Sequence, residues 1–292
     1  MSGHRFGLRG GGKAELTIDA LATVRLELDS RPECITLVRS MLAGLGEYLE
    51  LDPELLDDLK TAISEACNNV VLHAYGDASG PLEMSLSVTE DDFEVSIRDH
   101  GVGIQRVSPA ENRMGVGLAL ISALARRAEF QSEPGQGTEV KMSFGIAGVG
   151  AREALRDRGG VMITPTPGQV GGDILVTVGP ADLLGQVMGR LVRAVAASEY
   201  FSVDRFASLH VLTSAISARA AATGQGEGEV TFAISGKPKH LDLRVGPLPS
   251  GSSEDLFAAP APSGLDGLIE RVGVAPMPQG ELLEVVVAEP PR

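Results

Sequence analysis

The feature that most constrains this chain is an internal repeat with an offset of 150 residues. Residues 24–28 (VRLEL) alternate as in a β-strand, and residues 174–178 (ILVTV) read as the equivalent strand. Each segment precedes an apolar stripe at helical spacing, formed by Leu37, Val38, Met41, Leu42 and Leu45 in the first half and by Val187, Met188, Leu191, Val192 and Val195 in the second. Matching spacings in matching order predict a tandem repeat of one domain.

Later segments extend the repeat at slightly smaller offsets. FEVSIR at 93–98 corresponds to LDLRVG at 241–246, and GLALISALA at 117–125 corresponds to GLDGLIERV at 264–272. A chance coincidence of two similar segments is the alternative, but the order of every element also matches.

The length of 292 residues is consistent with two domains. We expect a flexible tail over residues 1–19 and a first domain over 20–145. A linker rich in glycine and proline follows over 146–172, and the second domain covers 173–292.

Composition argues against several classes of partner. The formal net charge is −14 and the pI is about 4.8, so phosphate backbones and anionic lipid repel the chain, and neither nucleic acid nor membrane is expected as a partner. No stretch approaches the ~20 apolar residues of a membrane span, and residues 1–13 lack the apolar core of a signal peptide. We therefore expect a cytoplasmic protein. Cys34 and Cys67 lack metal-site spacing and are expected to be small core residues.

The first half contains the candidate site. Its pattern predicts helices and strands at 53–74 (helix), 82–88 and 93–98 (strands), 116–127 (helix) and 138–144 (strand).

A polar stripe on the first of these helices indicates a ligand. Glu65, Asn69 and His73 stand at i, i+4 and i+8, so they share one face of an otherwise mostly apolar helix. Buried polar groups need partners, and a triphosphate with its metal ion would supply them. The asparagine offers Mg²⁺ a neutral oxygen, and the glutamate is suited to orient or deprotonate a hydroxyl. His73 could equally be a hydrogen-bonded histidine beside the site.

Three glycine-containing motifs complete the pattern. DHGVGI at 99–104 follows a strand, so Asp99 can accept from an exocyclic amine while Gly101 and Gly103 let the backbone approach a flat base. RMGVGLALI at 113–121 opens a helix at Gly115 and Gly117, where backbone N–H groups favour phosphate. GQGTEV at 135–140 places a threonine hydroxyl, that of Thr138, at the start of a strand.

Together these motifs resemble those of the GHKL (Bergerat-fold) ATPases, and within that superfamily the anti-sigma factor serine kinases of bacteria. SEACNNVVLHAY resembles their N-box, RDHGVGI their adenine-binding box, and a short lid of about eleven residues separates Gly103 from Gly115. The resemblance covers about residues 20–145. It implies an α+β fold, here two tandem sandwiches with helices on one face of a mixed sheet.

The resemblance also implies ATP and Mg²⁺ as cofactors and a role for each site residue. Glu65 corresponds to the catalytic base and Asn69 to the magnesium ligand. Asp99 binds the adenine amine, Thr138 helps to hold the base, and Arg113 stands where the family has an arginine before its second glycine box. His100 is expected to be exposed.

The second half lacks this chemistry. Ala215 corresponds to Glu65, Arg219 to Asn69, and Pro247 to Asp99 at an offset of 148. Arginine carries a permanent charge and no acceptor, so it cannot ligate a cation. Related kinases act as homodimers, and the degenerate second copy could serve as a built-in partner that makes the chain a monomeric pseudo-dimer. The alternative is a separate protein-binding module.

These observations predict a protein-serine kinase that acts as an anti-sigma factor. It would bind a sigma factor or similar regulator and phosphorylate a serine of a STAS-type antagonist. The alternative is a non-catalytic, ATP-dependent binding module, against which the intact Glu65 counts. A sensor histidine kinase needs a phosphoacceptor hairpin upstream, and only about 20 residues precede the domain.

Overall fold

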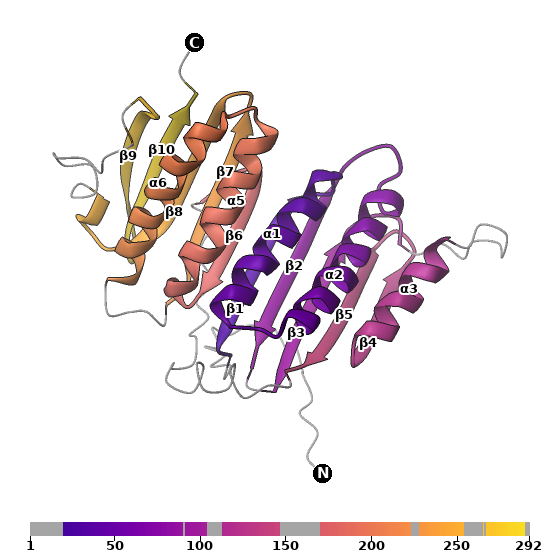
Figure 1. Cartoon of the computed structure of the whole chain (residues 1–292). Coiled ribbons are helices and arrows are strands. Elements are labelled where there is room, and N and C mark those ends of the chain that lie inside the picture. Colours follow the sequence, from indigo (N-terminus) through magenta and orange to yellow (C-terminus); the bar gives the residue numbers. More distant parts are fainter. Residues whose placement is uncertain are drawn as a thin grey trace.

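A computed structural model describes residues 20–89, 91–103, 113–146, 170–222, 228–253, 265 and 267–289 (Figure 1). The expected tail at 1–19, most of the expected linker and most of the expected lid between Gly103 and Gly115 lie outside these residues. The elements of the first half are β1 (Ala22–Asp29), α1 (Glu33–Tyr48), α2 (Pro53–His73), β2 (Pro81–Val88), β3 (Asp92–Asp99), α3 (Arg113–Leu124), β4 (Arg127–Glu133) and β5 (Gly137–Gly145). Those of the second half are β6 (Ile174–Gly179), a 3-10 turn (Ala181–Leu183), α5 (Leu184–Ser198), α6 (Val203–Ala221), β7 (Val230–Lys237), β8 (His240–Leu248), β9 (Ile269–Met277) and β10 (Gly280–Ala288).

The strands form one 10-stranded sheet in the order β4-β5-β3-β2-β1-β6-β7-β8-β10-β9. Every neighbouring pair of these strands is antiparallel. The expectation of two sandwiches with mixed sheets is therefore corrected: the chain has an α+β fold in which both halves share a single antiparallel sheet.

The connection between β3 and β4 explains why parallel neighbours are absent among the described strands. Helix α3 returns the chain so that β4 runs in the same direction as β3, but the next strand, β5, pairs with both of them in the opposite direction. The second half places β10 between β8 and β9 in the same way.

The two halves meet at the β1–β6 pair. Leu26 lies opposite Val176, which stands 150 positions later in the sequence. Val24 lies opposite Val178 and Leu28 opposite Ile174, so shifting the residues of these three pairs by this offset gives the same three pairs. This reciprocity is the pattern of a twofold interface, in which the same patch is used by both partners. That the second half is a degenerate copy of the first stays a prediction.

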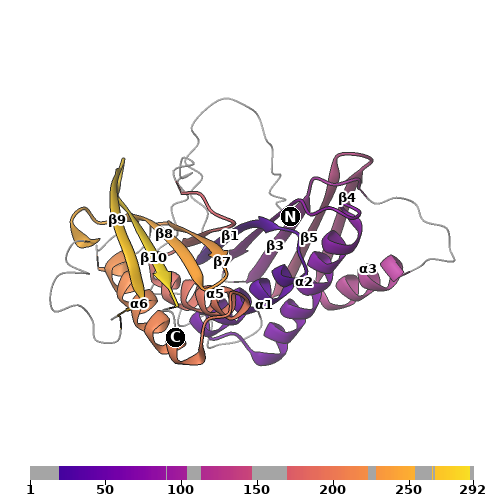
Figure 2. The ribbon, with the colours of Figure 1, turned by 90° about the horizontal axis from the view of Figure 1, so that it is seen from above.

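All the helices in the described part of the chain lie on one face of the sheet, and none of them covers the other face, which is called the open face below (Figures 1 and 2). One continuous core runs between the layers through both halves, and its side chains are mostly aliphatic, as the composition suggests. Helices α1 and α5 pack together where the halves meet. A Cβ at Gly44 would lie 2.4 Å from the carbonyl oxygen of Gln186, so glycine permits this approach, and Arg190 forms an ion pair with Glu47 beside it.

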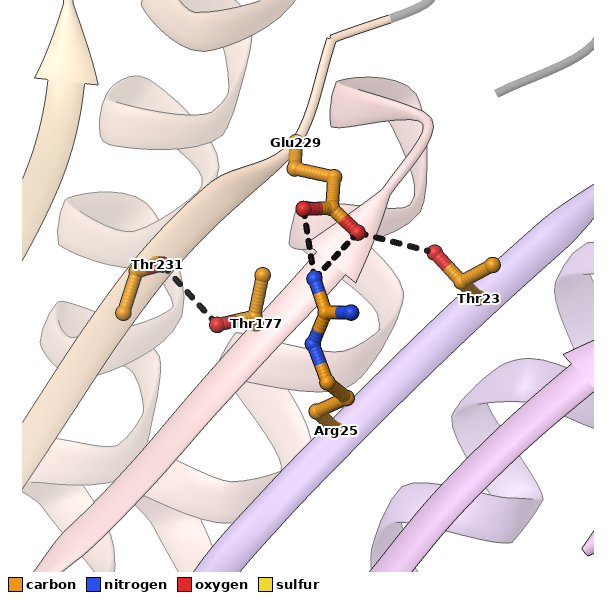
Figure 3. Close-up of polar contacts among 5 residues, drawn as sticks. All are labelled: Thr23, Arg25, Thr177, Glu229 and Thr231. Carbon is orange, nitrogen blue, oxygen red and sulfur yellow. Dashed lines mark hydrogen bonds and ion pairs between the residues drawn. The ribbon is translucent and has the colours of Figure 1, made fainter. Parts of the chain in front are cut away.

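On the open face, polar side chains connect the halves (Figure 3). Arg25 Nη2 on β1 donates to both carboxylate oxygens of Glu229, at 2.7 and 2.6 Å, across the intervening strand β6. Thr23 Oγ1 donates to the same carboxylate at 3.4 Å. The Glu229 side chain is only 3% exposed, whereas that of Arg25 is 39% exposed.

The turns between the paired helices are also equivalent. Glu50 and Tyr200 both have positive φ, at 50° and 62°, and each follows a helix whose last carbonyls accept bonds from the turn. The N–H groups of Leu51 and Phe201 bond to the carbonyls of Gly46 and Ala196, again 150 positions apart. These αL caps satisfy the free carbonyls at the helix ends.

Most elements of the first half were predicted within a few residues. One region in each half was not predicted correctly. The strand β4 was missed, and the segment 264–272, matched to the α3 helix, contains the start of strand β9 instead. Both β4 and β9 are edge strands with many exposed side chains, and the apolar alternation of β4 is limited to Ala128 and Phe130, so their patterns are weaker than those of a central strand. Among the described residues, no helix is long and apolar enough to cross a membrane. Cys34 and Cys67 are buried in the core, as predicted.

Candidate functional site

A pocket opens between helices α2 and α3 and the sheet of the first half. Its polar or glycine lining comes from Asn69 and His73 on α2, Asp99 at the end of β3, Gly103 in the following loop and Thr138 on β5. The apolar lining consists of Ala66, Val70, Ala74, Ile97, Leu118 and Val140. An apolar cleft with a few convergent polar groups is the usual form of a small-molecule site.

The polar stripe of α2 faces this region. Asn69 is half-buried, and its Nδ2 is buried without a hydrogen-bond partner among the described residues. Because an unpaired buried donor is costly, this amide is suited to a ligand in the pocket. Glu65, one turn earlier, is half-buried beside α3, where a Cβ at Gly117 would lie 2.2 Å from its Oε1. Gly117 thus leaves room for the glutamate carboxylate.

Asp99 forms part of the floor of the pocket. It is 3% exposed, and its Oδ1 accepts a hydrogen bond of 2.8 Å from the backbone N–H of Gly101. A carboxylate has further lone pairs, so Asp99 can still accept from an amine in the pocket. Two glycines fit tightly around this aspartate. A Cβ at Gly101 would lie 2.1 Å from the carbonyl oxygen of Ala74, and one at Gly137 would lie 2.0 Å from that of Asp99 itself.

The far wall is formed by β5, with β4 paired to it on the outer side. The Thr138 hydroxyl lies 3.2 Å from that of Ser132, which also donates to the carbonyl of Gly137 at 3.2 Å. Gly103 has a φ of 76° and packs against β4, where a Cβ would lie 2.6 Å from the carbonyl oxygen of Glu133. The loop after β3 is therefore held by the β4–β5 hairpin.

The structure brings four of the predicted site residues, Asn69, Asp99, Gly103 and Thr138, into one pocket. Three more lie beside them or behind them: Glu65 and Gly117 in contact on α2 and α3, and Gly101 against α2. Arg113 and Gly115 belong to the first turn of α3, but their side-chain environments lie outside the described residues. His73 lines the pocket with an exposed side chain, so its role stays open.

His100 is exposed, as expected, and its Nε2 lies 2.9 Å from Glu83 Oε1 on the open face.

The side chains fit Mg²⁺ only as a partner of a phosphate ligand. Among the described residues, no group of three or more His, Cys, Asp or Glu side chains could hold a metal ion by itself. Asn69 offers one neutral oxygen at the pocket, and Mg²⁺ commonly takes one or two protein ligands with the rest from phosphates and water. The donor set is therefore compatible with Mg²⁺ bound to a triphosphate and not with a separate metal centre.

The sequence motifs did not single out Tyr75 and Ser132 as site residues. The Tyr75 hydroxyl contacts the loop beside Asp99. Burial raises the pKa of this hydroxyl, and the hydrogen bond from the His100 N–H lowers it. The nearby charges of Asp99 and Glu83 add to the rise. Tyr75 ends the N-box motif, but its contact reaches across the fold. No spacing rule could have identified it.

In the second half, a glutamate of β10 binds the loop that follows β8. Glu281 follows Gly280 as Thr138 follows Gly137, and its carboxylate accepts 2.7 Å hydrogen bonds from the N–H groups of Gly251 and Ser253. The pairing of β8 with β10 shifts by one residue here, and Gly280 lies against the carbonyl of Leu248 as Gly137 lies against that of Asp99.

Under the predicted repeat, this packing would make Leu248, rather than Pro247, the counterpart of Asp99. The physical reason is the irregularity between Glu281 and Leu283, which a constant offset cannot represent. The corrected position is a buried leucine, so it too lacks a carboxylate.

Comparisons with known proteins match the part of the chain that contains this pocket. The model of the histidine kinase-like ATPase domain matches residues 28–144. The chain is 38% identical over 131 residues to the anti-sigma F factor of Pasteuria penetrans, covering 41% of this chain and 87% of that protein. It is 28% identical over 130 residues to the anti-sigma F factor of Caldanaerobacter subterraneus subsp. tengcongensis, covering 41% and 91%.

Among solved structures, the histidine kinase domain from the blue-light activated histidine kinase EL346 of Erythrobacter litoralis is similar at 18% identity. It covers 51% of this chain and 70% of that one, with a TM-score of 0.30, which is too low to support a statement about the fold. The sequence identity to the anti-sigma F factors is higher, and the match to the family model, residues 28–144, includes every residue that lines the pocket. Through its first half, the chain belongs to the family of the histidine kinase-like ATPase domain.

Proposed function

We propose that this protein binds Mg-ATP in the pocket of its first half and transfers the terminal phosphoryl group to a serine of a partner protein. The observation that carries the proposal is the convergence of Asp99 from the sheet and Asn69 from α2 on one pocket, with Glu65 one helical turn away on the same face of α2. This arrangement provides Asp99 for the adenine ring, Asn69 for the phosphates and Glu65 for the reacting serine hydroxyl.

Adenine would lie against Asp99. A buried carboxylate at the end of β3 accepts the exocyclic amine of adenine, and the glycines beside it admit a flat ring. Guanine presents a carbonyl oxygen at the same place, which a carboxylate repels. The pocket therefore favours ATP over GTP.

The phosphates would extend toward Asn69 and the start of α3. The N-terminal end of a helix attracts anions through its free N–H groups, and Gly117 keeps the α2–α3 contact close. Bound Mg²⁺ spreads charge over the phosphate oxygens, and the Asn69 amide is the protein ligand that fits it.

Glu65 would act on the attacking serine. Its carboxylate lies at the α2–α3 contact, where it can accept the proton of a serine hydroxyl as the phosphorus–oxygen bond forms. The resemblance places Arg113 near the transferring phosphoryl group, where a guanidinium stabilises negative charge.

The names of the relatives suggest the biological partners. Several similar proteins are anti-sigma F factors, which supports binding of a sigma factor or similar regulator and a STAS-type antagonist as phosphorylation substrate. The second half, as a degenerate copy, would replace the second subunit of a homodimer. The reciprocal β1–β6 pairing and the packed α1 and α5 helices support this role.

The second candidate is an ATP-dependent binding module without phosphoryl transfer. The experiment compares wild type, Glu65→Gln and the control Glu54→Gln, which changes an exposed glutamate at the start of the same helix. ATP affinity is measured by calorimetry, and transfer of labelled phosphate is measured with candidate antagonist proteins.

We expect Glu65→Gln to retain ATP affinity and to lose transfer by about 10²–10⁴-fold, while Glu54→Gln behaves as wild type. Normal transfer by Glu65→Gln would place the base elsewhere. ATP binding without transfer to any antagonist would favour the binding module.

A further inference from the structure

The end of α2 is attached to the loop that follows β3 by two hydrogen bonds. The hydroxyl of Tyr75 accepts one of 2.9 Å from the backbone N–H of His100. The carbonyl of Ala74 accepts the other, also of 2.9 Å, from the N–H of Val102. These bonds lie on either side of Gly101, whose N–H in turn donates to Asp99.

Tyr75 is itself held firmly in place. Its hydroxyl donates a 2.6 Å hydrogen bond to the carbonyl of Pro81 at the start of β2. The ring occupies space that a side chain at position 80 would fill, because a Cβ at Gly80 would lie 2.4 Å from the ring. Burial raises the pKa of the hydroxyl, so it stays protonated and can donate to Pro81 while it accepts from His100.

The position of the Asp99 carboxylate depends on this loop. Its Oδ1 is bonded to Gly101 N–H, and that N–H is oriented by the peptide groups on either side of it. Ala74 holds the later side through its backbone, which nearly every residue could do. Tyr75 holds the earlier side through its side chain, so it is the part of the attachment that a substitution can remove.

We propose that Tyr75 is a positioning residue that fixes the loop 99–102 so that Asp99 meets the amine of adenine, and that it thereby sets the preference for adenine nucleotides. This inference rests on the proposed binding of ATP. It does not require Tyr75 to contact the nucleotide.

The test uses the full chain and compares two nucleotides that differ at the base. ATP carries an amine that can donate to Asp99, whereas inosine triphosphate carries a carbonyl oxygen there and has the same ribose and phosphates. Calorimetry with each nucleotide is carried out on wild type, on Tyr75→Phe and on the control Tyr200→Phe. The control removes the hydroxyl of a tyrosine that is 74% exposed in the second half.

We expect Tyr75→Phe to weaken ATP binding by about 2- to 10-fold, the equivalent of one neutral hydrogen bond. Binding of inosine triphosphate should change by less than about twofold, because that nucleotide gains nothing from Asp99. The ratio of the two affinities should fall accordingly, and Tyr200→Phe should leave it unchanged. In an Asp99→Asn background, Tyr75→Phe should produce no further change in the ratio.

If Tyr75 had a purely structural role, Tyr75→Phe would weaken the binding of both nucleotides equally. An unchanged ratio in Tyr75→Phe would therefore overturn the inference, and so would an equal fall of the ratio in the Asp99→Asn background. Both affinities are measured on the same preparation, so partial unfolding of the variant cancels from the ratio. Failure of the wild type to bind ATP would instead overturn the proposed function.

Discussion

The ion pair between Arg25 and Glu229 gives a prediction about how the two halves are held together. The pair is asymmetric, because the glutamate side chain is 3% exposed and the arginine side chain is 39% exposed. We consider two substitutions that each remove one charge, Arg25→Met and Glu229→Gln. If burial decides the energetics, the two changes should differ in their cost.

Arg25→Met should be the more damaging change. It leaves a buried carboxylate with the hydroxyl of Thr23 as its remaining partner among the contacts described above. Loss of a charged hydrogen-bonded partner by a buried group costs about 2–3 kcal/mol. Glu229→Gln keeps an acceptor for Thr23 and Arg25, and the freed guanidinium can reach water, so we expect about 0.5–1.5 kcal/mol.

The cost of Arg25→Met should also depend on pH. Burial raises the pKa of Glu229, and Arg25 partly offsets this rise, so removal of the arginine raises the pKa further. A carboxyl with a raised pKa in the folded state binds more protons than in the unfolded chain. Its stabilising contribution is present below the unfolded pKa of about 4.3 and is lost as pH rises through the folded value. The difference in unfolding free energy between wild type and Arg25→Met should thus shrink as the pH falls from about 7 to about 4.5.

Urea denaturation at several pH values, followed by circular dichroism, measures both effects. The matched control is Arg31→Met, which breaks an exposed ion pair of 3.1 Å with Asp29 at the end of the same strand and should cost less than about 1 kcal/mol. The reasoning is refuted if Arg25→Met costs no more than Glu229→Gln, or if its cost grows as the pH falls.

Three further predictions concern the site and the assembly. Asp99→Asn should weaken ATP binding by roughly 10- to 150-fold, measured by calorimetry, and equal affinity of the wild type for ATP and GTP would contradict the assignment. Gly137→Ala should lower the unfolding midpoint, because φ is 88° and the new Cβ would lie 2.0 Å from the Asp99 carbonyl oxygen. The expected loss of folding free energy exceeds about 1 kcal/mol. Gly135→Ala is the control, since Gly135 has a similar φ but open space around it. Light scattering should find the full chain to be a 30.4 kDa monomer, whereas the isolated residues 20–146 should dimerise or aggregate through the uncovered β1 edge; a full-length dimer beside a monomeric fragment would refute the pseudo-dimer.

Sequence patterns were sufficient where one residue type at one spacing decides the structure. Helix α2 was predicted almost to the residue, because Pro53 marks its start and the apolar positions define its buried face. The polar residues of the same helix led directly to Asn69, which lines the pocket. Central strands with strict alternation, such as β3, were equally clear.

Patterns were insufficient where contacts between distant segments decide the structure. The strand β4 has an apolar alternation of only two residues, Ala128 and Phe130, and it pairs with β5 along its whole length. The shared sheet could not be inferred, since nothing in either half alone indicates that β1 pairs with β6. The one-residue shift opposite Glu281 could not be predicted for the same reason: an irregularity in pairing leaves no mark on composition or period.

The position of the β1–β6 pair also bears on how the protein is made. Strand β1 lies near the beginning of the chain, and the residue that faces Leu26 is made 150 residues later. At roughly 5–20 residues per second, a ribosome needs about 8–30 s to complete this interval. During that time the edge of β1 that later pairs with β6 has no partner from its own chain. Leu26 stands at the centre of a reciprocal pairing, so the β1 strands of two nascent chains on one messenger could pair with each other. Delayed synthesis of β6 therefore leaves this edge of β1 open to wrong pairing, and slower translation of residues 146–172 would increase the risk.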